Sequence, residues 1–160
     1  MPGDLHNHST CSDGSVPIYR LPILAARAGL DAMALSDHDT LRSAQYAYDH
    51  PVQDGVRLIP ATELTGYDYE RHHRVHLLAY WPDLESPALR EVYHYLFGWN
   101  PRGVVLHSPE YLPVREVLAT AKAAGACVVF AHPTVYSSMP LLRELVKEGA
   151  VDGIEVEHPS

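Results

Sequence analysis

The sequence predicts an α/β domain in which short strands alternate with helices. Apolar runs of strand length are followed by helical patterns of about 10 to 15 residues, and this alternation is typical of βαβ units in a parallel sheet. The chain has 160 residues, 46% of them hydrophobic, which is enough for one core and too little for two. No repeat or long linker divides it. We therefore expect a single domain over residues 1–160.

The first half of the chain is expected to begin with a strand over 3–9 and a helix over 16–28 that ends before Gly29. Further strands and one helix follow in alternation. We expect strands over 31–36, 56–61 and 74–80, and a helix over 40–48.

The second half continues the same alternation. Helices are expected over 86–97 and over 113–124, the second one stopped by Gly125. The clearest strand pattern covers 127–131, followed by a helix over 139–148 and a strand over 153–156. Such a fold gathers its chemistry at the ends of strands, because the loops that follow the strands share one face of the sheet.

Composition excludes several classes of function. The formal net charge is -8, which opposes binding to long nucleic acids and provides no basic patch for a membrane surface. No apolar run reaches the ~20 residues of a membrane helix, and the N-terminus lacks a signal-peptide pattern, so we expect a cytoplasmic protein. Cys11 and Cys127 cannot form a disulfide framework and are expected to be buried or half-buried.

Histidine is unusually frequent, with 11 residues against 12 lysines and arginines together. Because histidine is the commonest metal ligand, this frequency in an acidic chain indicates a metal site. Several histidines and acids follow predicted strands, whereas His76 lies early in its strand. We therefore expect that this strand can run against the others.

His6 and His8 are two residues apart in a segment predicted to be extended, so both side chains leave the same face and can bind one ion. The alternative is a chance pair of surface histidines. The Ser-Thr-Cys-Ser-Asp-Gly segment that follows is typical of a turn, which can bring Asp13 back toward the two histidines.

Four further acids and histidines have simpler explanations when each is taken alone. Asp39 or Thr40 could cap the next helix while His38 remains an ordinary loop residue. Glu63 could be a solvated acid, and His132 a histidine of the core. Together they favour a metal centre, because a carboxylate that bridges two cations offsets the repulsion between them.

The segments DLHNHSTCSDGS, GLDAMALSDHDT, PATELT, VHLLAY and VVFAHP occur in this order. Together they resemble the PHP superfamily, named for polymerase and histidinol phosphatase, and are most similar to its branch of 3',5'-nucleoside bisphosphate phosphatases and short-RNA 5' exonucleases. The resemblance covers the whole chain, from Asp4 to about His158, and implies a distorted (β/α)7 barrel with two or three divalent metal ions, which could be manganese, iron or zinc.

The resemblance also implies roles for individual residues. The first ion would be held by His6, His8 and Glu63, and Glu63 would bridge to a second ion held with His76 and His132. Asp13 and His38 would contribute to a third ion, Glu63 and His38 would be the catalytic residues, and Asp37 and Asp39 would orient imidazole rings from behind. The ligands expected to bind metal are thus His6, His8, Asp13, His38, Glu63, His76 and His132.

These features predict a hydrolase of phosphomonoesters or short nucleotide phosphodiesters in which a hydroxide held between two metal ions attacks phosphorus. The alternative is a metal-binding PHP module with a structural or partner-binding role and little activity. The substrate would be a phosphorylated small molecule or a short nucleotide. The oligomeric state is left open.

The chain also departs from the superfamily pattern in three places. The region 81–125 is shorter than in relatives that carry a helical insertion there, and Thr134-Val135-Tyr136 replaces a common Gly-Arg-Tyr. Arg71, Arg74 or Arg102 could supply the phosphate contact instead, although solvated surface charges are the simpler interpretation. The terminal Gly-Ser-Asp-x-His motif is absent, and His158 is not expected to replace it. We therefore expect a C-terminally incomplete domain whose first and third metal sites lack ligands.

Overall fold

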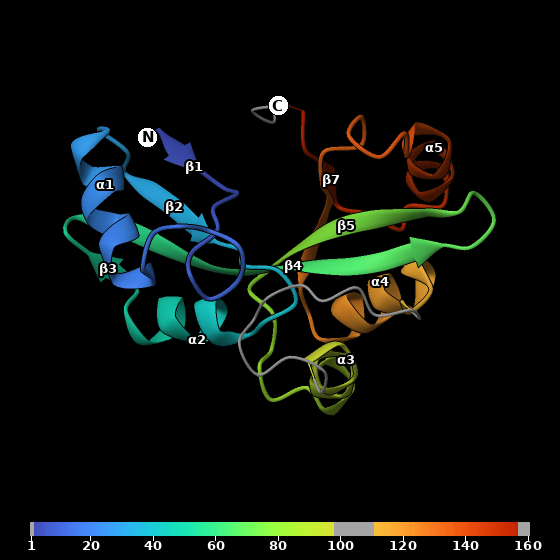
Figure 1. Cartoon of the computed structure of the whole chain (residues 1–160), viewed down its shortest axis with the longest axis horizontal. Coiled ribbons are helices and arrows are strands. Elements are labelled where there is room, and N and C mark those ends of the chain that lie inside the picture. Colours follow the sequence, from blue (N-terminus) through green and yellow to red (C-terminus); the bar gives the residue numbers. More distant parts are fainter. Residues whose placement is uncertain (1, 98–110, 157–160) are drawn as a thin grey trace.

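The computed structural model describes residues 2–97 and 111–156 of the chain. Its centre is a curled mixed sheet of seven strands with helices packed on its outer side (Figure 1). The strand order is β1-β2-β4-β5-β6-β7, with β3 paired to β4 beside this path. The elements are β1 (Gly3–Asp4), the 3-10 helix η1 (Ile18–Arg20), α1 (Leu21–Arg27), β2 (Ala32–Leu35), α2 (Arg42–Asp49), β3 (Val52–Gln53), β4 (Val56–Asp68), β5 (His73–Tyr80), α3 (Pro87–Phe97), α4 (Val114–Ala123), β6 (Cys127–Phe130), α5 (Met139–Lys147) and β7 (Gly153–Ile154).

All the predicted helices and strands exist, but some bounds differ. The predicted first strand ends at Asp4, so the two histidines that follow leave an irregular segment. The predicted first helix starts as η1 and becomes α-helical only at Leu21, next to Pro22 at the helix N-terminus, where proline is tolerated. The strand expected over 56–61 continues to Asp68, and the short β3 was not expected.

The sheet is parallel except at the pairs made by the short β3 and by β5, and β5 is the strand that was expected to run against the others. The strand β5 runs antiparallel to both β4 and β6, whereas β1, β2, β4 and the β6–β7 pair follow parallel pairing. The N-terminal end of β5 therefore lies beside the C-terminal ends of β4 and β6. This confirms the expected direction of the strand. It also explains how His76, in the first half of β5, lies at the same edge of the sheet as residues that follow other strands.

Because successive side chains along each strand point to opposite faces, the sheet has an outer and an inner face. On the outer face, Leu64, Leu77 and Phe130 pack with residues of α4 and α5, while Met33 and Leu58 pack in the cluster that includes α1 and α2 residues. The inner face holds a smaller cluster of mostly small or aliphatic residues. Glu63 follows the inward-facing register of Ile59 and Ala61, so its carboxylate lies inside the curl.

Other sequence expectations are resolved less directly. Both cysteines are free; Cys11 is half-buried as expected, but Cys127, the first residue of β6, is exposed. Arg102 and His158 lie outside the described residues. Within the described chain, no helix has the length and apolar character needed to cross a membrane.

Candidate metal centre

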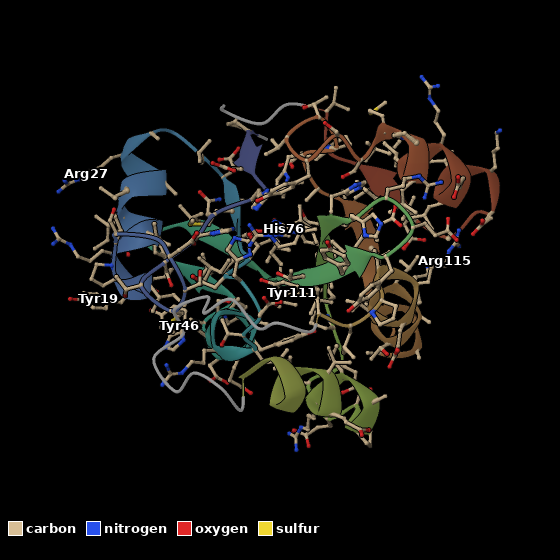
Figure 2. The ribbon with its side chains drawn as sticks, turned by 45° about the vertical axis from the view of Figure 1, so that its right-hand side comes forward. Tyr19, Arg27, Tyr46, His76, Tyr111 and Arg115 are labelled. Atoms are coloured by element: carbon tan, nitrogen blue, oxygen red, sulfur yellow. The ribbon has the colours of Figure 1, made fainter. Side chains whose placement is uncertain are left out.

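The seven residues expected to bind metal converge on one cleft of about 350 Å³. Three come from the segment after β1, one from the segment after β2, and the others from β4, β5 and the end of β6. Figure 2 shows His76 in the interior, among side chains from both halves of the sheet, whereas Arg27 and Arg115 lie at the periphery. The lining residues are His6, His8, Asp13, His38, Glu63, His76, His132, Val135 and Tyr136.

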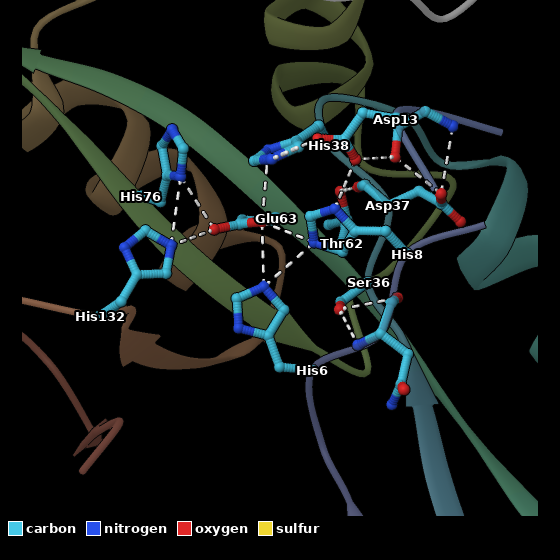
Figure 3. Close-up of polar contacts among 12 residues, drawn as sticks. His6, His8, Asp13, Ser36, Asp37, His38, Thr62, Glu63, His76 and His132 are labelled. Atoms are coloured by element: carbon cyan, nitrogen blue, oxygen red, sulfur yellow. Dashed lines mark hydrogen bonds and ion pairs between the residues drawn. The ribbon is translucent and has the colours of Figure 1, made fainter. Parts of the chain in front are cut away.

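Glu63 lies at the centre of this cleft and is almost fully buried, with 1% of its surface exposed. Its Oε2 atom is 3.0 Å from Nε2 of His6 and 2.8 Å from Nε2 of His8. Its Oε1 atom is 2.9 Å from Nδ1 of His76 and 2.8 Å from Nε2 of His132. Each oxygen therefore serves a different pair of imidazoles (Figure 3).

The two imidazoles within each pair also lie close to each other. The Nε2 atoms of His6 and His8 are 3.1 Å apart, and Nδ1 of His76 is 3.3 Å from Nε2 of His132. Neighbouring ligands of a metal at ~2.1 Å are about 3.0 to 3.4 Å apart, so the two imidazole nitrogens of each pair have the spacing of metal ligands. The Glu63 oxygens, at 2.8 to 3.0 Å from these nitrogens, lie at hydrogen-bond distance. The residues assigned to the first and the second ion by the resemblance thus lie on different oxygens of Glu63, and their binding of metal stays a prediction.

His38 lies closer to Glu63 than the sequence suggested. The segment 37–39 extends the pairing of β2 with β4, since Asp39 N–H donates to the Glu63 carbonyl and Glu63 N–H to that of Asp37. His38 Nδ1 is buried and 3.3 Å from Glu63 Oε2, yet it has no hydrogen-bond partner among the residues that the structure describes. A buried nitrogen without a partner, aimed at a carboxylate among other imidazoles, fits a bound cation. With His8 and Glu63 it forms a group that could hold one.

The turn expected after His8 is present and brings Asp13 close to His8 and His38. The N–H groups of Ser12 and Gly14 donate to the Ser9 carbonyl, and this places Asp13 Oδ1 2.7 Å from His8 Nδ1. The other oxygen, Oδ2, is 3.7 Å from His38 Nε2. Because 57% of its side chain is exposed, Asp13 forms the outer wall of the cleft.

Asp37 and Asp39 were expected to orient imidazoles, and the structure corrects this expectation. Hydrogen bonds to the Asp37 carboxylate come from the backbone and hydroxyl groups of Ser9 and Ser12. Those to Asp39 come from the backbone and hydroxyl of Thr65. Through these hydrogen bonds the two acids hold the first loop and β4 in place instead.

Burial and charge set the protonation of the cleft. Burial disfavours ionised Glu63, but hydrogen bonds from four imidazoles outweigh it and hold its pKa well below the ordinary value. Burial also opposes the charged form of His8, whereas Glu63 and Asp13 raise its pKa to about 9. His38 is dominated by burial, which lowers its pKa to about 4. His38 is thus neutral at pH 7, the form of histidine that binds metals.

Sequence reasoning missed two residues at the cleft. Glu155 Oε1 lies 2.8 Å from His6 Nδ1, and Tyr136 lines the cleft with its ring centroid 5.1 Å from that of His76. Glu155 follows the last predicted strand, so its position at a strand end was the available signal. Tyr136 gave no comparable signal.

The three arginines considered for phosphate differ in their surroundings. The guanidinium group of Arg71 is paired with Asp68 and Glu144, on the far side of the β4–β5 hairpin. Arg74 lies two residues from His76 on the same face of β5, and its Cζ atom is 5.9 Å from the Tyr136 ring centroid. Arg74 is therefore the arginine that borders the cleft among those described.

The fold and the cleft define an α/β domain that surrounds a buried carboxylate with imidazoles suited to divalent metal ions. The model of the family described as PHP domain matches residues 4–137. The chain therefore belongs to the PHP domain family.

Curated relatives match about half of the chain. A phosphoribosyl 1,2-cyclic phosphate 1,2-diphosphodiesterase from Eggerthella lenta is 36% identical over 86 residues, 54% of this chain and 33% of the relative. The 5'-3' exoribonuclease Rnm from Salmonella typhimurium is 30% identical over 90 residues, 55% of this chain and 30% of the relative. These matches span about a third of each relative.

Solved structures share the fold over nearly the whole chain. A Bifidobacterium adolescentis protein described as a metal-dependent phosphoesterase superposes with a TM-score of 0.81 at 22% identity, covering 97% of this chain and 77% of that one. An amidohydrolase from Chromobacterium violaceum, solved with bound sulfate and without metal, has a TM-score of 0.81 at 18% identity, with 96% and 76% covered. At these identities the likeness establishes the fold, and it confirms the predicted PHP barrel class.

Proposed function

We propose that this chain is a hydrolase that cleaves phosphoesters with the help of two or three divalent metal ions. The observation that carries the proposal is the division of Glu63 between two imidazole pairs, one on each carboxylate oxygen. One carboxylate shared in this way can hold two ions together and offset their repulsion.

The residues that would hold the ions follow from these contacts. His6 and His8 would bind one ion together with Oε2 of Glu63. His76 and His132 would bind a second ion together with Oε1. Asp13 and His38 would contribute at the open side, where they lie 3.7 Å apart. Nitrogen and oxygen donors together suit manganese, iron or zinc. When bound, such ions supply Lewis acidity and activate water near neutral pH.

The protein's own contribution is to position these groups and to restrict the substrate. Glu63 is held rigidly within β4, and burial keeps competing solvent from its carboxylate. A cleft of about 350 Å³ accepts a phosphate group with a small attached moiety. The named activities of the curated relatives, on a cyclic phosphate ester and on RNA, support a phosphomonoester or a short nucleotide phosphodiester as substrate.

The test combines metal loading with a small set of substrates. Metal-depleted protein would be reloaded with Mn²⁺, Zn²⁺ or Fe²⁺, the bound metal counted, and hydrolysis of aryl phosphates, cyclic phosphates and dinucleotides measured. We expect the wild-type chain to turn over substrate only when metal is bound. The Glu63→Gln variant should have no turnover and should bind at least one ion fewer than wild type. His50→Gln, which changes an exposed histidine at the end of α2, is the matched control and should leave both unchanged.

Two results would count against the proposal. Full activity of Glu63→Gln would exclude the shared carboxylate. Tight metal binding by the wild-type chain without turnover of any substrate would favour the alternative, a metal-binding module with a structural or partner-binding role.

A further inference from the structure

The two edges of the curled sheet face each other across an open groove. In the part of the chain that the structure describes, β1 pairs only with β2 and β7 only with β6, so no backbone ladder joins the two edges. A cavity of about 1100 Å³ lies between them, lined by residues that follow the two edge strands, such as Leu5 and Glu155, and by Tyr80 of β5. The histidines of the candidate metal centre come from both sides of this opening.

Side-chain contacts cross the groove where the backbone does not. Glu155 follows β7, and its Oε1 lies 2.8 Å from Nδ1 of His6, which follows β1 and is 149 residues away in sequence. Its Oε2 accepts the backbone N–H of His132 at 2.7 Å. The Tyr80 hydroxyl adds a second support by donating to the Leu5 carbonyl at 2.8 Å.

The atoms involved distinguish a supporting residue from a metal ligand. Glu155 contacts Nδ1 of His6, whereas Nε2 of the same ring faces His8 and Glu63. A carboxylate that accepts Nδ1–H would keep the ring in the tautomer whose Nε2 can bind an ion in place of its hydrogen bond to Glu63, and it also fixes the plane of the ring. Glu155 thus presents the ligand atom of His6 to the cleft without entering the cleft itself.

The second oxygen of Glu155 acts on a strained piece of backbone. His132 has a φ of 24°, in the left-handed region that residues other than glycine rarely adopt. Such conformations persist where surrounding contacts hold them, and they gather at functional sites. The bond from His132 N–H to Glu155 is one such contact, so a single carboxylate orients one histidine from each of the two imidazole pairs.

We propose that Glu155 is a positioning residue that links the two open edges of the sheet and sets the geometry of His6 and His132 for metal binding. This inference rests on the proposed function, because it assumes that these histidines bind metal. It assigns no bond-making step to Glu155.

The matched control is Asp152, which lies just before β7. Its carboxylate accepts the backbone N–H of Val128 at 2.8 Å and pairs with Lys122, so it anchors β7 to β6 without contacting a histidine of the cleft. Replacing Asp152 therefore reports the effect of loosening β7 alone.

The experiment measures Zn²⁺ binding to the full chain by calorimetric titration, with no phosphoester present. We expect Glu155→Ala to weaken Zn²⁺ binding about 10- to 100-fold, the usual cost of removing a group that orients a ligand. Glu155→Gln should lose nearly as much, because an amide can serve only one of the two N–H groups as acceptor. Asp152→Asn should stay within about twofold of wild type.

A second readout monitors the imidazole of His6 directly. In ¹⁵N–¹H spectra of the zinc-loaded wild-type chain, we expect a slowly exchanging Nδ1–H signal from His6. The signal should be retained in Asp152→Asn, lost in Glu155→Ala, and weakened by faster exchange in Glu155→Gln, because the neutral amide is a poorer acceptor than the carboxylate. The Glu155→Gln variant preserves size and shape, so it remains informative if Glu155→Ala does not fold.

The outcomes separate this inference from the proposed function. Equal Zn²⁺ affinity of wild type and both Glu155 variants, or equal losses in Glu155→Gln and Asp152→Asn, would overturn the positioning role even if the enzyme were active. Weakened binding and a lost or weakened Nδ1–H signal would support the role even if no phosphoester were cleaved.

Discussion

At the scale of single residues, the cleft depends on which oxygen or nitrogen of each side chain is used. Glu63 divides its two oxygens between two imidazole pairs, and His6 divides its two nitrogens between Glu63 and Glu155. A change of one atom can therefore be more informative than removal of a whole side chain.

Arg74 gives a residue-scale prediction about the substrate. Its guanidinium group lies over Tyr136 at the border of the cleft, where it can contact a substrate phosphate. Because a hydrogen bond to a charged group contributes about 1.5 to 3 kcal/mol, we expect Arg74→Ala to raise KM roughly 10- to 100-fold with a smaller change in kcat. Steady-state kinetics on the best substrate provide the measurement.

Arg71→Ala is the control for this prediction. It removes an arginine of the same hairpin whose guanidinium group is already paired with Asp68 and Glu144. It should lower stability and leave KM unchanged. An unchanged KM in Arg74→Ala would show that phosphate is held elsewhere.

The imidazoles also predict how the stability of the metal-free protein varies with pH. The pKa of His38 is lowered to about 4, below the ~6.5 of an unfolded histidine, so its contribution is present above pH ~6.5 and is lost as pH falls toward 4. The pKa of His8 is raised to about 9, so its contribution is present below pH ~6.5 and is lost as pH rises through 9.

Urea unfolding in EDTA at several pH values tests both signs. The free energy of unfolding of wild type, measured relative to His38→Gln, should fall as the pH is lowered from 6.5 to 5. Measured relative to His8→Gln, it should fall as the pH is raised from 6.5 to 9. Each change should be on the order of 1 to 3 kcal/mol. Differences that do not vary with pH would contradict these assignments.

At the scale of elements, the turn between β1 and α1 is packed too tightly for a larger residue. A Cβ atom on Gly14 would lie 2.3 Å from the His8 carbonyl oxygen, which is backbone and cannot rotate away. Gly14→Ala should therefore displace Asp13 from His8 and cost about 1 to 3 kcal/mol of stability.

Thermal unfolding and metal titration of Gly14→Ala provide the measurement. We expect a lower Tm and weaker metal binding together. The neighbouring substitution Ser15→Ala, at an exposed position, should change neither. A Gly14→Ala protein with wild-type stability would mean that the turn can relax away from His8.

At the scale of the whole molecule, the candidate metal centre lies between two halves of the sheet. His6, His8 and His38 come from the β1–β2 half, His76 and His132 from the β5–β6 half, and β4 carries Glu63 between them. Metal bound to all of these groups should tie the halves together. A ligand at 100 times its Kd stabilises the folded state by about 2.7 kcal/mol.

Hydrogen exchange followed by mass spectrometry tests this coupling. Added Zn²⁺ should slow amide exchange in both β2 and β6, and EDTA should reverse the effect. Protection confined to one half would show that one imidazole pair binds metal independently of the other.

The sequence by itself determined the fold class, the approximate helices and strands, and the chemical types of the ligands. These features depend on local periodicity and on residues placed at strand ends. His6 and His8 could be paired because their separation of two is a property of the chain. Asp13 could be placed near them because a turn acts over a few residues.

Only the tertiary structure decided how these groups combine. The contacts of Glu63 with His6 and His132 cross 57 and 69 residues, and the contact of Glu155 with His6 crosses 149. Such contacts depend on strand order, strand direction and register, which local patterns do not specify. For the same reason, the carboxylates of Asp37 and Asp39 could not be assigned to Ser9, Ser12 and Thr65 before the curl of the sheet placed those groups beside them.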